Sequence, residues 1–332
     1  MNYLFPVLLI IFIISTFQIS KEQSTSLNMA NWMSNLPDDK KILLINIPGS
    51  HNTAANVLHP LGESVARTQN RTIPELLRFG VRKLDIRVTI RELLEGDDED
   101  SDLSTCHGMF DCYFIDENNV TKNLTFKHIL LDIKDFLEEY PTETVIVWTQ
   151  SEKGDSYQNY KRAIELFEKL VGDIFVKFDK NLKLGDVRGK IVSTTYKTDL
   201  IDSEGKAIYH FGIDGGTDLE EIHRKFIDYY YNTWEVTGQL KVEEVKEFLR
   251  TYDLSIKEVE EEFEKKIDDY PISYSVACTG EHQSILPFPK IQADIVNPFI
   301  LGYDFKKGNY YGWIDMDFAS LELAKTLIDT NF

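Results

Sequence analysis

The sequence predicts an α/β fold organised around a parallel sheet. Short apolar runs alternate along the chain with segments whose apolar residues recur every three or four positions, the patterns of buried strands and amphipathic helices. The sequence has no internal repeat and no long low-complexity linker. The residues best suited to catalysis stand at or just after predicted strand ends, where barrels of parallel strands bind their ligands.

The first predicted strand is a buried apolar run at 41–47, which a Pro-Gly pair ends. A short helix is predicted at 72–80. Thr72 is its expected N-cap, and Pro74 lies in the first turn, where a missing N–H is tolerated. Gly80 ends this helix.

The middle of the chain continues the alternation of strands and helices. A second strand is predicted at 81–89, and the acidic segment after it, 95–102, is expected to be a solvated loop. Helical spacing at 126–140 precedes a third strand at 144–148, and another helix is predicted at 160–171.

The alternation of strands and helices continues in the last part of the chain. A strand is predicted at 191–195, and a charged helical stretch at 242–266. Late strands at 271–278 and 312–318 precede a closing helix at 320–328. The whole pattern therefore fits βα units rather than an all-β or all-α fold.

Composition limits the class of protein. The chain has 332 residues, 42% of them hydrophobic and 12% aromatic, which suits a globular enzyme of one large barrel or two ordinary domains. The net charge of −19 argues against a nucleic-acid partner. It would also repel an anionic membrane at long range, so any lipid contact is expected to be local, through apolar loops or a small basic patch.

The N-terminus is predicted to be a targeting segment. The apolar run at 4–14 is short for a membrane span, so residues 1–20 are expected to form a secretory signal peptide, with an uncleaved signal anchor as the alternative. A polar linker is expected at 21–29, and the catalytic domain at 30–332. This arrangement predicts a secreted or lumenal protein.

Sequons and cysteines add to the prediction of secretion. Three N-glycosylation sequons begin at Asn70, Asn119 and Asn123. The chain has three cysteines. Cys106 and Cys112 flank a histidine and could close a disulfide; the alternative is that these thiols are unpaired and partly buried.

Two histidine motifs with a charged strand between them carry most of the functional signal. His51 follows the first strand, and His107 precedes a glycine. Asp85 and Arg87 are two positions apart on a strand, so they point to the same face, either as a plain ion pair or as functional groups. Two imidazoles and a guanidinium are the groups needed to cleave a phosphodiester through an internal hydroxyl.

In this order and spacing, the motifs resemble the X domain of phosphatidylinositol-specific phospholipases C, most of all the secreted, single-domain bacterial branch. The resemblance rests on residues 47–52, 84–87 and 107–108, with support from 32–33, 141–144, 183–190 and 313–317. It covers roughly residue 30 to the end. It implies a TIM-type (β/α)8 barrel that is distorted and incompletely closed.

The resemblance also implies a reaction. The inositol 2-hydroxyl attacks phosphorus and diacylglycerol leaves, giving a cyclic phosphodiester that water opens more slowly. Carried onto this chain, His51 is the general base, His107 the general acid and Arg87 the stabiliser of the phosphoryl oxygens. Asp317 would hold the His51 ring, and Asp85 would orient Arg87 or a substrate hydroxyl.

A reaction without metal or other cofactor is predicted. Calcium-dependent relatives hold the ion with several oxygen ligands; here Lys83 stands where they supply a glutamate, and Gln150 near another. Arg87 matches the arginine that replaces calcium in the bacterial enzymes. Asn52 departs from the bacterial pattern, which has aspartate there. It is expected to weaken His107 as an acid, and it leaves a remnant calcium site as an alternative.

The residues that would bind the headgroup match less well. Gln150 and Tyr196 stand where bacterial members place basic residues that grip the inositol. Asp214 aligns with an aspartate near the 2-hydroxyl, and Tyr311 is a candidate to cover the inositol ring. We therefore expect a monomer that acts on a phosphoinositide or another inositol-containing lipid at a membrane surface.

Two other functions are left open. One is a binding barrel with weakened catalysis, suggested by Asn52, Gln150 and Tyr196. The other is a metal-dependent phosphodiesterase of barrel fold acting on another phospholipid. Such an enzyme needs Glu and Asp around the first histidine, whereas Lys83 and Arg87 stand there.

Overall fold

The computed structural model describes residues 27–194 apart from His59 and Leu94, together with 199–201, 207–210, 238–251, 254–266, 273–275 and 288–332. The predicted leader at 1–20, Tyr196, Asp214 and Cys278 lie outside the described residues. Among the helices described, none has the length and apolar character that crossing a bilayer requires.

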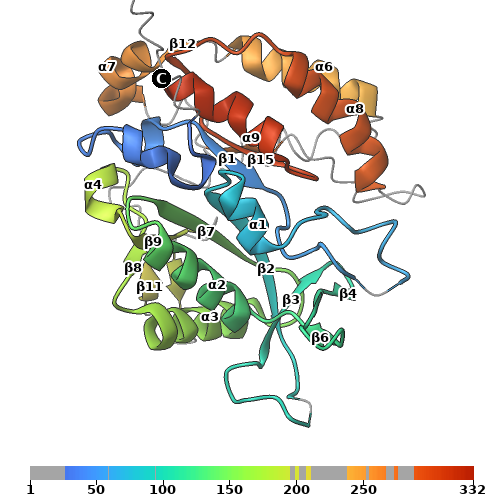
Figure 1. Ribbon diagram of the computed structural model, residues 1–332. Coiled ribbons are helices and arrows are strands. Elements are labelled where there is room, and N and C mark those ends of the chain that lie inside the picture. The colour runs from blue at the N-terminus through green and yellow to red at the C-terminus, as the bar shows by residue number, and fades with distance from the viewer. Residues whose placement is uncertain are drawn as a thin grey trace, which may run out of the picture.

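A sheet of parallel strands forms the centre of the described structure (Figure 1). Its main path runs in the order β13 (Ser273–Ser275), β15 (Trp313–Met316), β1 (Ile47–Ser50), β2 (Lys83–Ile90), β7 (Thr144–Ser151), β9 (Lys190–Thr194) and β8 (Phe175–Lys177). Every pair on this path is parallel. Two more strands extend the sheet in antiparallel order: β3 (Leu103–His107) pairs with β2, and β4 (Phe110–Asp111) pairs with β3.

Smaller strand pairs and helices surround this sheet. The antiparallel pairs are β5 (Tyr113–Ile115) with β6 (Thr121–Asn123), β10 (Asp199–Ile201) with β11 (Ala207–His210), and β12 (Leu254–Ser255) with β14 (Asn309–Tyr310). The helices are α1 (Ile73–Arg78), α2 (Phe126–Glu139), α3 (Ser156–Val171), α4 (Leu184–Val187), α6 (Gly238–Thr251), α7 (Ile256–Lys266), α8 (Pro289–Gly302) and α9 (Leu321–Ile328). Short 3-10 helices are η1 (Met29–Asn35), η2 (Ile42–Leu44) and η4 (Asp329–Asn331).

The predicted fold class is confirmed. Parallel strands are covered by helices on the outside, as in a TIM-type barrel, with α2 and α3 beside the β7 side of the sheet and α8 and α9 beside its other end (Figure 1). Within the described residues, no hydrogen-bonded ladder joins β8 to β13, so the described strands form an open sheet.

Local signals predicted α1 well. The Thr72 hydroxyl accepts a hydrogen bond from the Glu75 N–H, and the Glu75 side chain accepts one from the Thr72 N–H in return. Pro74 lies in the first turn, and Gly80, at φ +102°, follows the helix end. Thr72, Pro74 and Gly80 therefore have the places that the sequence predicted.

Two predicted elements are wrong in extent. The strand expected at 41–47 instead contains the 3-10 helix η2 at 42–44, and β1 begins only at Ile47. Ile42, Leu43 and Leu44 are all buried, so this apolar run has no polar face whose period could separate strand from helix. The charged stretch at 242–266 is two helices, α6 and α7, rather than one.

Of the two alternatives for Cys106 and Cys112, the structure has the unpaired one, because both thiols are free and buried. In the β3–β4 hairpin Cys106 pairs with Asp111, and the Cys112 N–H donates to the Thr105 carbonyl at 3.0 Å. Successive residues of a strand point to opposite faces, so the two cysteine side chains leave the hairpin on opposite sides. Burial raises the pKa of Cys106 to about 12 and keeps it a thiol.

A buried ion pair at the amino ends of the strands helps to hold η1 against the sheet. The Arg82 guanidinium donates to Glu143 at 2.8 and 2.9 Å, and both side chains are fully buried. Arg82 also donates to the Ala30 carbonyl at 2.7 Å, and the Trp32 indole donates to the Gly80 carbonyl at 3.0 Å. Because Arg82 precedes β2 and Glu143 precedes β7, this end of the sheet is opposite the end where the predicted catalytic residues lie.

Candidate active site

The carboxyl ends of four neighbouring strands bring polar side chains together. In the parallel register, Gly49 of β1 lies between Asp315 of β15 and Lys83 of β2, and Arg87 of β2 lies beside Gln150 of β7. Alternate residues of a strand share one face. The ladder therefore directs side chains of β1, β2, β7 and β15 into the same end of the barrel.

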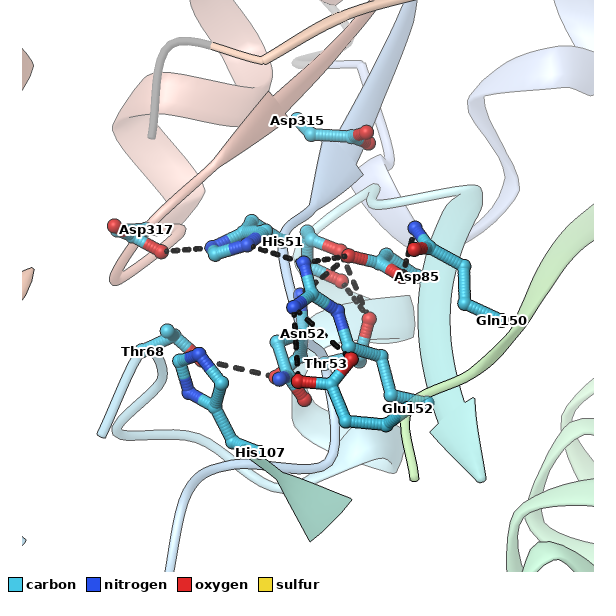
Figure 2. A network of polar contacts seen from close by, with 12 residues as sticks. His51, Asn52, Thr53, Thr68, Asp85, His107, Gln150, Glu152, Asp315 and Asp317 are labelled. Carbon is cyan, nitrogen blue, oxygen red and sulfur yellow. Dashed lines mark hydrogen bonds and ion pairs between the residues drawn. The ribbon is translucent and has the colours of Figure 1, made fainter. Parts of the chain in front are cut away.

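His51 is held at both ring nitrogens. Its Nδ1 lies 2.8 Å from Asp317 Oδ1, and its Nε2 lies 2.8 Å from a terminal nitrogen of Arg87, as Figure 2 shows for the Asp317 contact. A guanidinium only donates, so Nε2 is the acceptor and Nδ1 carries the proton given to Asp317. This tautomer presents the Nε2 lone pair to the site, as a general base requires.

The backbone around His51 is fixed by an amide side chain from the following loop. Gln69 Nε2 donates to the carbonyls of His51 and Met316 at 2.8 and 2.9 Å, and the Ala319 N–H donates to Gln69 Oε1 at 3.1 Å. Gln69 thus joins the ends of β1 and β15. The His51–Asp317 contact is consequently set by a rigid connection between the two strands.

Arg87 lies between two carboxylates. One terminal nitrogen donates to Asp85 Oδ2 at 3.3 Å, and the other lies 3.4 Å from both oxygens of Glu152. Asp85 also accepts from Gln150 Nε2 at 3.1 Å and from the Asn52 N–H at 3.0 Å. Burial opposes the charge of Asp85, but Arg87 and the other neighbouring cations hold the pKa of this carboxyl below its usual value.

His107 ends β3 and faces His51 across the site. The two rings meet edge to face, with centroids 6.0 Å apart and planes at 88°. His107 Nδ1 lies 2.5 Å from the Ala66 carbonyl, which can only accept, so Nδ1 carries a proton. Burial and the positive charge of Arg87 lower the pKa of His107 to about 4.

Asn52 occupies a strained and polar position beside these groups. Its backbone is left-handed, with φ +36°, and its side chain is fully buried. Neither Oδ1 nor Nδ2 has a hydrogen-bond partner among the described residues. The backbone carbonyl accepts from the Thr68 hydroxyl at 2.9 Å, so the residue is fixed through its main chain rather than its amide.

Comparison with known proteins identifies this arrangement. Residues 46–196, which hold both histidines and Arg87, match the family model "Phosphatidylinositol-specific phospholipase C, X domain". Residues 46–196 belong to this X-domain family. The family that the motifs resembled is therefore confirmed.

Curated relatives extend the similarity beyond the X domain. The chain is 28% identical over 267 residues to a 1-phosphatidylinositol phosphodiesterase of Staphylococcus aureus, a match that covers 73% of each chain. It is 24% identical over 326 residues to the enzyme of the same name from Listeria monocytogenes, covering 94% of this chain and 88% of the relative.

Solved structures show the same fold. A mutant of the phosphatidylinositol-specific phospholipase C of Staphylococcus aureus superposes with a TM-score of 0.65 at 20% identity, over 92% of this chain and 98% of that one. The Listeria monocytogenes enzyme gives a TM-score of 0.57 at 19% identity, over 92% and 99%. At this identity the superpositions support the barrel fold and not the chemistry.

The structure gathers most of the predicted site residues in one place. Figure 2 shows His51, Asn52, Asp85, His107, Gln150 and Asp317 in this group. Arg87 joins the group through its contacts with His51 and Asp85. Asp214 lies outside the described residues. Among the described residues, no group of three or more His, Cys, Asp or Glu is arranged to hold a metal ion.

Tyr311 does not belong to the site, which corrects the prediction that it covers the inositol ring. It precedes β15 and so lies at the end of the strand opposite Asp317. Its ring is buried against Phe305 with centroids 4.9 Å apart, and its hydroxyl accepts from the Lys306 N–H at 3.0 Å. Tyr311 is a core residue.

Sequence reasoning missed Glu152 as a site residue. Besides its contact with Arg87, Glu152 Oε1 accepts from the Gly108 N–H at 2.8 Å, next to His107. Burial opposes its charge, but Arg87 and this N–H hold the pKa of Glu152 below its usual value. A signal was present in the sequence, because Glu152 directly follows β7 and is two positions after Gln150.

Proposed function

We propose that the protein is a phosphatidylinositol-specific phospholipase C, with one catalytic barrel over residues 30–332. It would cleave inositol phospholipids into diacylglycerol and a cyclic inositol phosphate. The observation that carries the proposal is the arrangement of His51, whose Nδ1 is bound by Asp317 and whose Nε2 meets Arg87, facing His107 across 6.0 Å. The X domain and the names of its relatives agree with it.

In the proposed reaction His51 is the general base. Its Nε2 takes the proton of the inositol 2-hydroxyl as that oxygen attacks phosphorus. In the free protein Nε2 accepts from Arg87, so the bound phosphodiester would take over this Arg87 N–H and free the lone pair. Asp317 then stabilises the imidazolium through the Nδ1–H contact of 2.8 Å.

Arg87 and its two carboxylates would receive the phosphoryl group. Asp85 and Glu152 fix the guanidinium plane from two sides, which leaves a rigid donor for the phosphoryl oxygens. Its positive charge stands where calcium-dependent relatives are expected to place the ion. We therefore propose that the reaction needs no divalent metal.

His107 would protonate the leaving oxygen of diacylglycerol. Its Nδ1–H is committed to the Ala66 carbonyl, so Nε2 delivers the proton as the bond from phosphorus to that oxygen breaks. A pKa of about 4 makes the free imidazole neutral at pH 7. A bound phosphodiester anion would offset the charge of Arg87 and raise this pKa. We therefore propose that substrate binding promotes protonation of His107, which can then act as the acid.

Substrate recognition and location are further parts of the proposal. Gln150, joined to Asp85, and Asp214 would contact the inositol hydroxyls. Leu61 and Met109, exposed by 74% and 78%, lie in loops after β1 and β3 and would touch the lipid surface. The leader and the exposed sequon residues Asn70 and Asn119 support secretion.

The test is release of water-soluble inositol phosphate from phosphatidylinositol in mixed micelles, first with EDTA and then with calcium. Wild-type protein is expected to turn over in EDTA, and His51→Ala is expected to lose activity by about 10²-fold or more. Equal activity of His51→Ala would contradict the proposal. Turnover that requires calcium would contradict its metal-free form.

A further inference from the structure

A second charged pair lies one layer beneath the catalytic residues. Lys83 Nζ donates to Asp315 Oδ2, and the side chains are exposed by only 2% and 10%. The ammonium group also lies 4.8 Å from the centroid of the Trp148 ring. A buried ion pair inside a barrel is costly to desolvate, so it needs a structural or functional reason.

Glycine at position 49 makes this pair possible. Gly49 of β1 separates Lys83 of β2 from Asp315 of β15 in the register of the sheet. A Cβ atom at Gly49 would lie 2.1 Å from Asp315 Oδ1, so any side chain there would displace the carboxylate. The missing side chain leaves room for the two charges to meet across β1.

Each member of the pair is two residues before an aspartate of the proposed active site. Lys83 is two residues before Asp85 on β2, so these two side chains share one face of the strand. Asp315 lies on β15 and is two residues before Asp317, which follows the end of that strand. Lys83 helps to hold the pKa of Asp85 down, whereas burial and the nearby Asp85 raise the pKa of Asp315, against the effects of Lys83 and His51.

Asp315 keeps one oxygen without a protein partner. Oδ1 is buried and has no hydrogen bond among the described residues, so Lys83 is the group that neutralises this carboxylate. Besides Lys83, the charged or titratable groups that act on Asp315 are Asp85 of β2 and His51, which directly follows β1. From β7 the pair meets Trp148, which is uncharged.

We infer that Lys83 and Asp315 are a positioning pair for the active site, whose opposed charges set the electrostatic balance under His51 and Asp85. The inference rests on the proposed function, in which His51 must be neutral and Asp85 ionised for Arg87 to be held. A pair that only filled the core would contribute to stability without setting the pH at which the site titrates.

The two charges predict opposite effects. Lys83→Met removes a positive charge beneath His51 and Asp85, so protons should bind there more readily and the acid limb of kcat/KM should move to higher pH. Asp315→Asn removes a negative charge and leaves Lys83 unopposed, so the acid limb should move to lower pH. Each shift should be roughly one pH unit. The double variant should return the limb to near its wild-type position.

The experiment combines pH profiles of kcat/KM with nuclear magnetic resonance titration of the His51 ring, assigned with His51→Gln. The ring titration needs no turnover, so it tests the pair even if the protein did not cleave phosphatidylinositol. Movement of the titration in opposite directions in the two single variants would support the inference. Movement in the same direction, or none, would overturn it. If Lys83→Met did not fold, the direction in Asp315→Asn would decide.

Discussion

The two histidines of the site have the same side chain and very different surroundings. His51 is bound on both nitrogens, by Asp317 and Arg87, which selects the tautomer of a base. His107 is bound through Nδ1 to the Ala66 carbonyl and has no carboxylate at position 52, where Asn52 stands. Environment rather than residue type thus separates base from acid.

The depressed pKa of His107 can be measured directly. In the free protein the His107 ring should titrate near pH 4, because burial and the charge of Arg87 oppose its protonation. Adding inositol 1-phosphate should raise this pKa by at least one unit, since the phosphate supplies negative charge. Nuclear magnetic resonance of the ring tests both statements. A pKa above 6 in the free protein, or no change when inositol 1-phosphate binds, would contradict the proposal that substrate promotes protonation of His107.

Low pH should also act on stability through His107. Its folded pKa of about 4 is below that of an exposed histidine, so the unfolded chain binds this proton more readily. The resulting loss of stability should begin as pH falls below about 6.5 and should grow until pH 4. The His107→Gln variant, which cannot titrate, should show a weaker decline in chemical unfolding measured across that range. The same loss of stability in wild type and His107→Gln would contradict a folded-state pKa of about 4 for His107.

Removing the charge of Asp317 should impair His51 while leaving the fold intact. Asp317→Asn keeps the size of the side chain but no longer stabilises the imidazolium, so kcat should fall by about 10²-fold or more. Asp329→Asn, at an exposed carboxylate in η4, is the matched control and should retain wild-type kcat. A nearly active Asp317→Asn would mean that the 2.8 Å contact has no role in catalysis.

At the scale of elements, the signals that predicted structure were local. The cap of α1 depends on Thr72, Pro74 and Glu75, which are neighbours in sequence, so it was predictable. The 3-10 turn at 42–44 was not, because its residues are buried on all sides and the Ile42 N–H pairs with the distant Leu182 carbonyl. Lys83 acquired its role only through the register that places it and Asp315 on either side of Gly49.

Gly49 of β1 packs closely against Asp315, so a substitution there should affect stability. Gly49→Ala should destabilise the protein by about 1–3 kcal/mol, because the new methyl group would overlap Asp315 in a packed interior. Gly302→Ala, at the end of α8, is the control, since nothing lies within 4 Å of the added atom. Thermal unfolding of both variants measures the difference. Equal melting temperatures would show that β1 accommodates a side chain there.

For the whole molecule, a buried stabilising ion pair and the proposed catalytic residues lie at opposite ends of the strands. The end with η1 holds the Arg82–Glu143 pair, and the other end holds His51, Arg87 and His107. The alternation of strands and helices predicted the barrel, and strand-end motifs predicted most of the site. The sequence did not exclude Tyr311, because its place at the wrong end of β15 depends on where that strand begins.

Arg82 should therefore matter for folding and not for turnover. Arg82→Met leaves Glu143 as an unpaired buried charge and should lower the free energy of unfolding by about 3–5 kcal/mol. Arg78→Met breaks an exposed pair with Glu139 and should cost less than about 1 kcal/mol. Chemical unfolding measures both. While folded, each variant should keep wild-type kcat/KM; a large loss in Arg82→Met would contradict the separation of the two ends.

The most direct test of the account is the effect of the leaving group on the two histidine variants. We would measure cleavage of two inositol phosphodiesters, one with an alkyl leaving group like diacylglycerol and one with an acidic phenol that departs without a proton. His107→Ala should lose about 10²–10⁴-fold on the alkyl ester and much less on the phenyl ester, whereas His51→Ala should lose activity on both. Equal losses of His107→Ala on the two esters would contradict its assignment as the general acid.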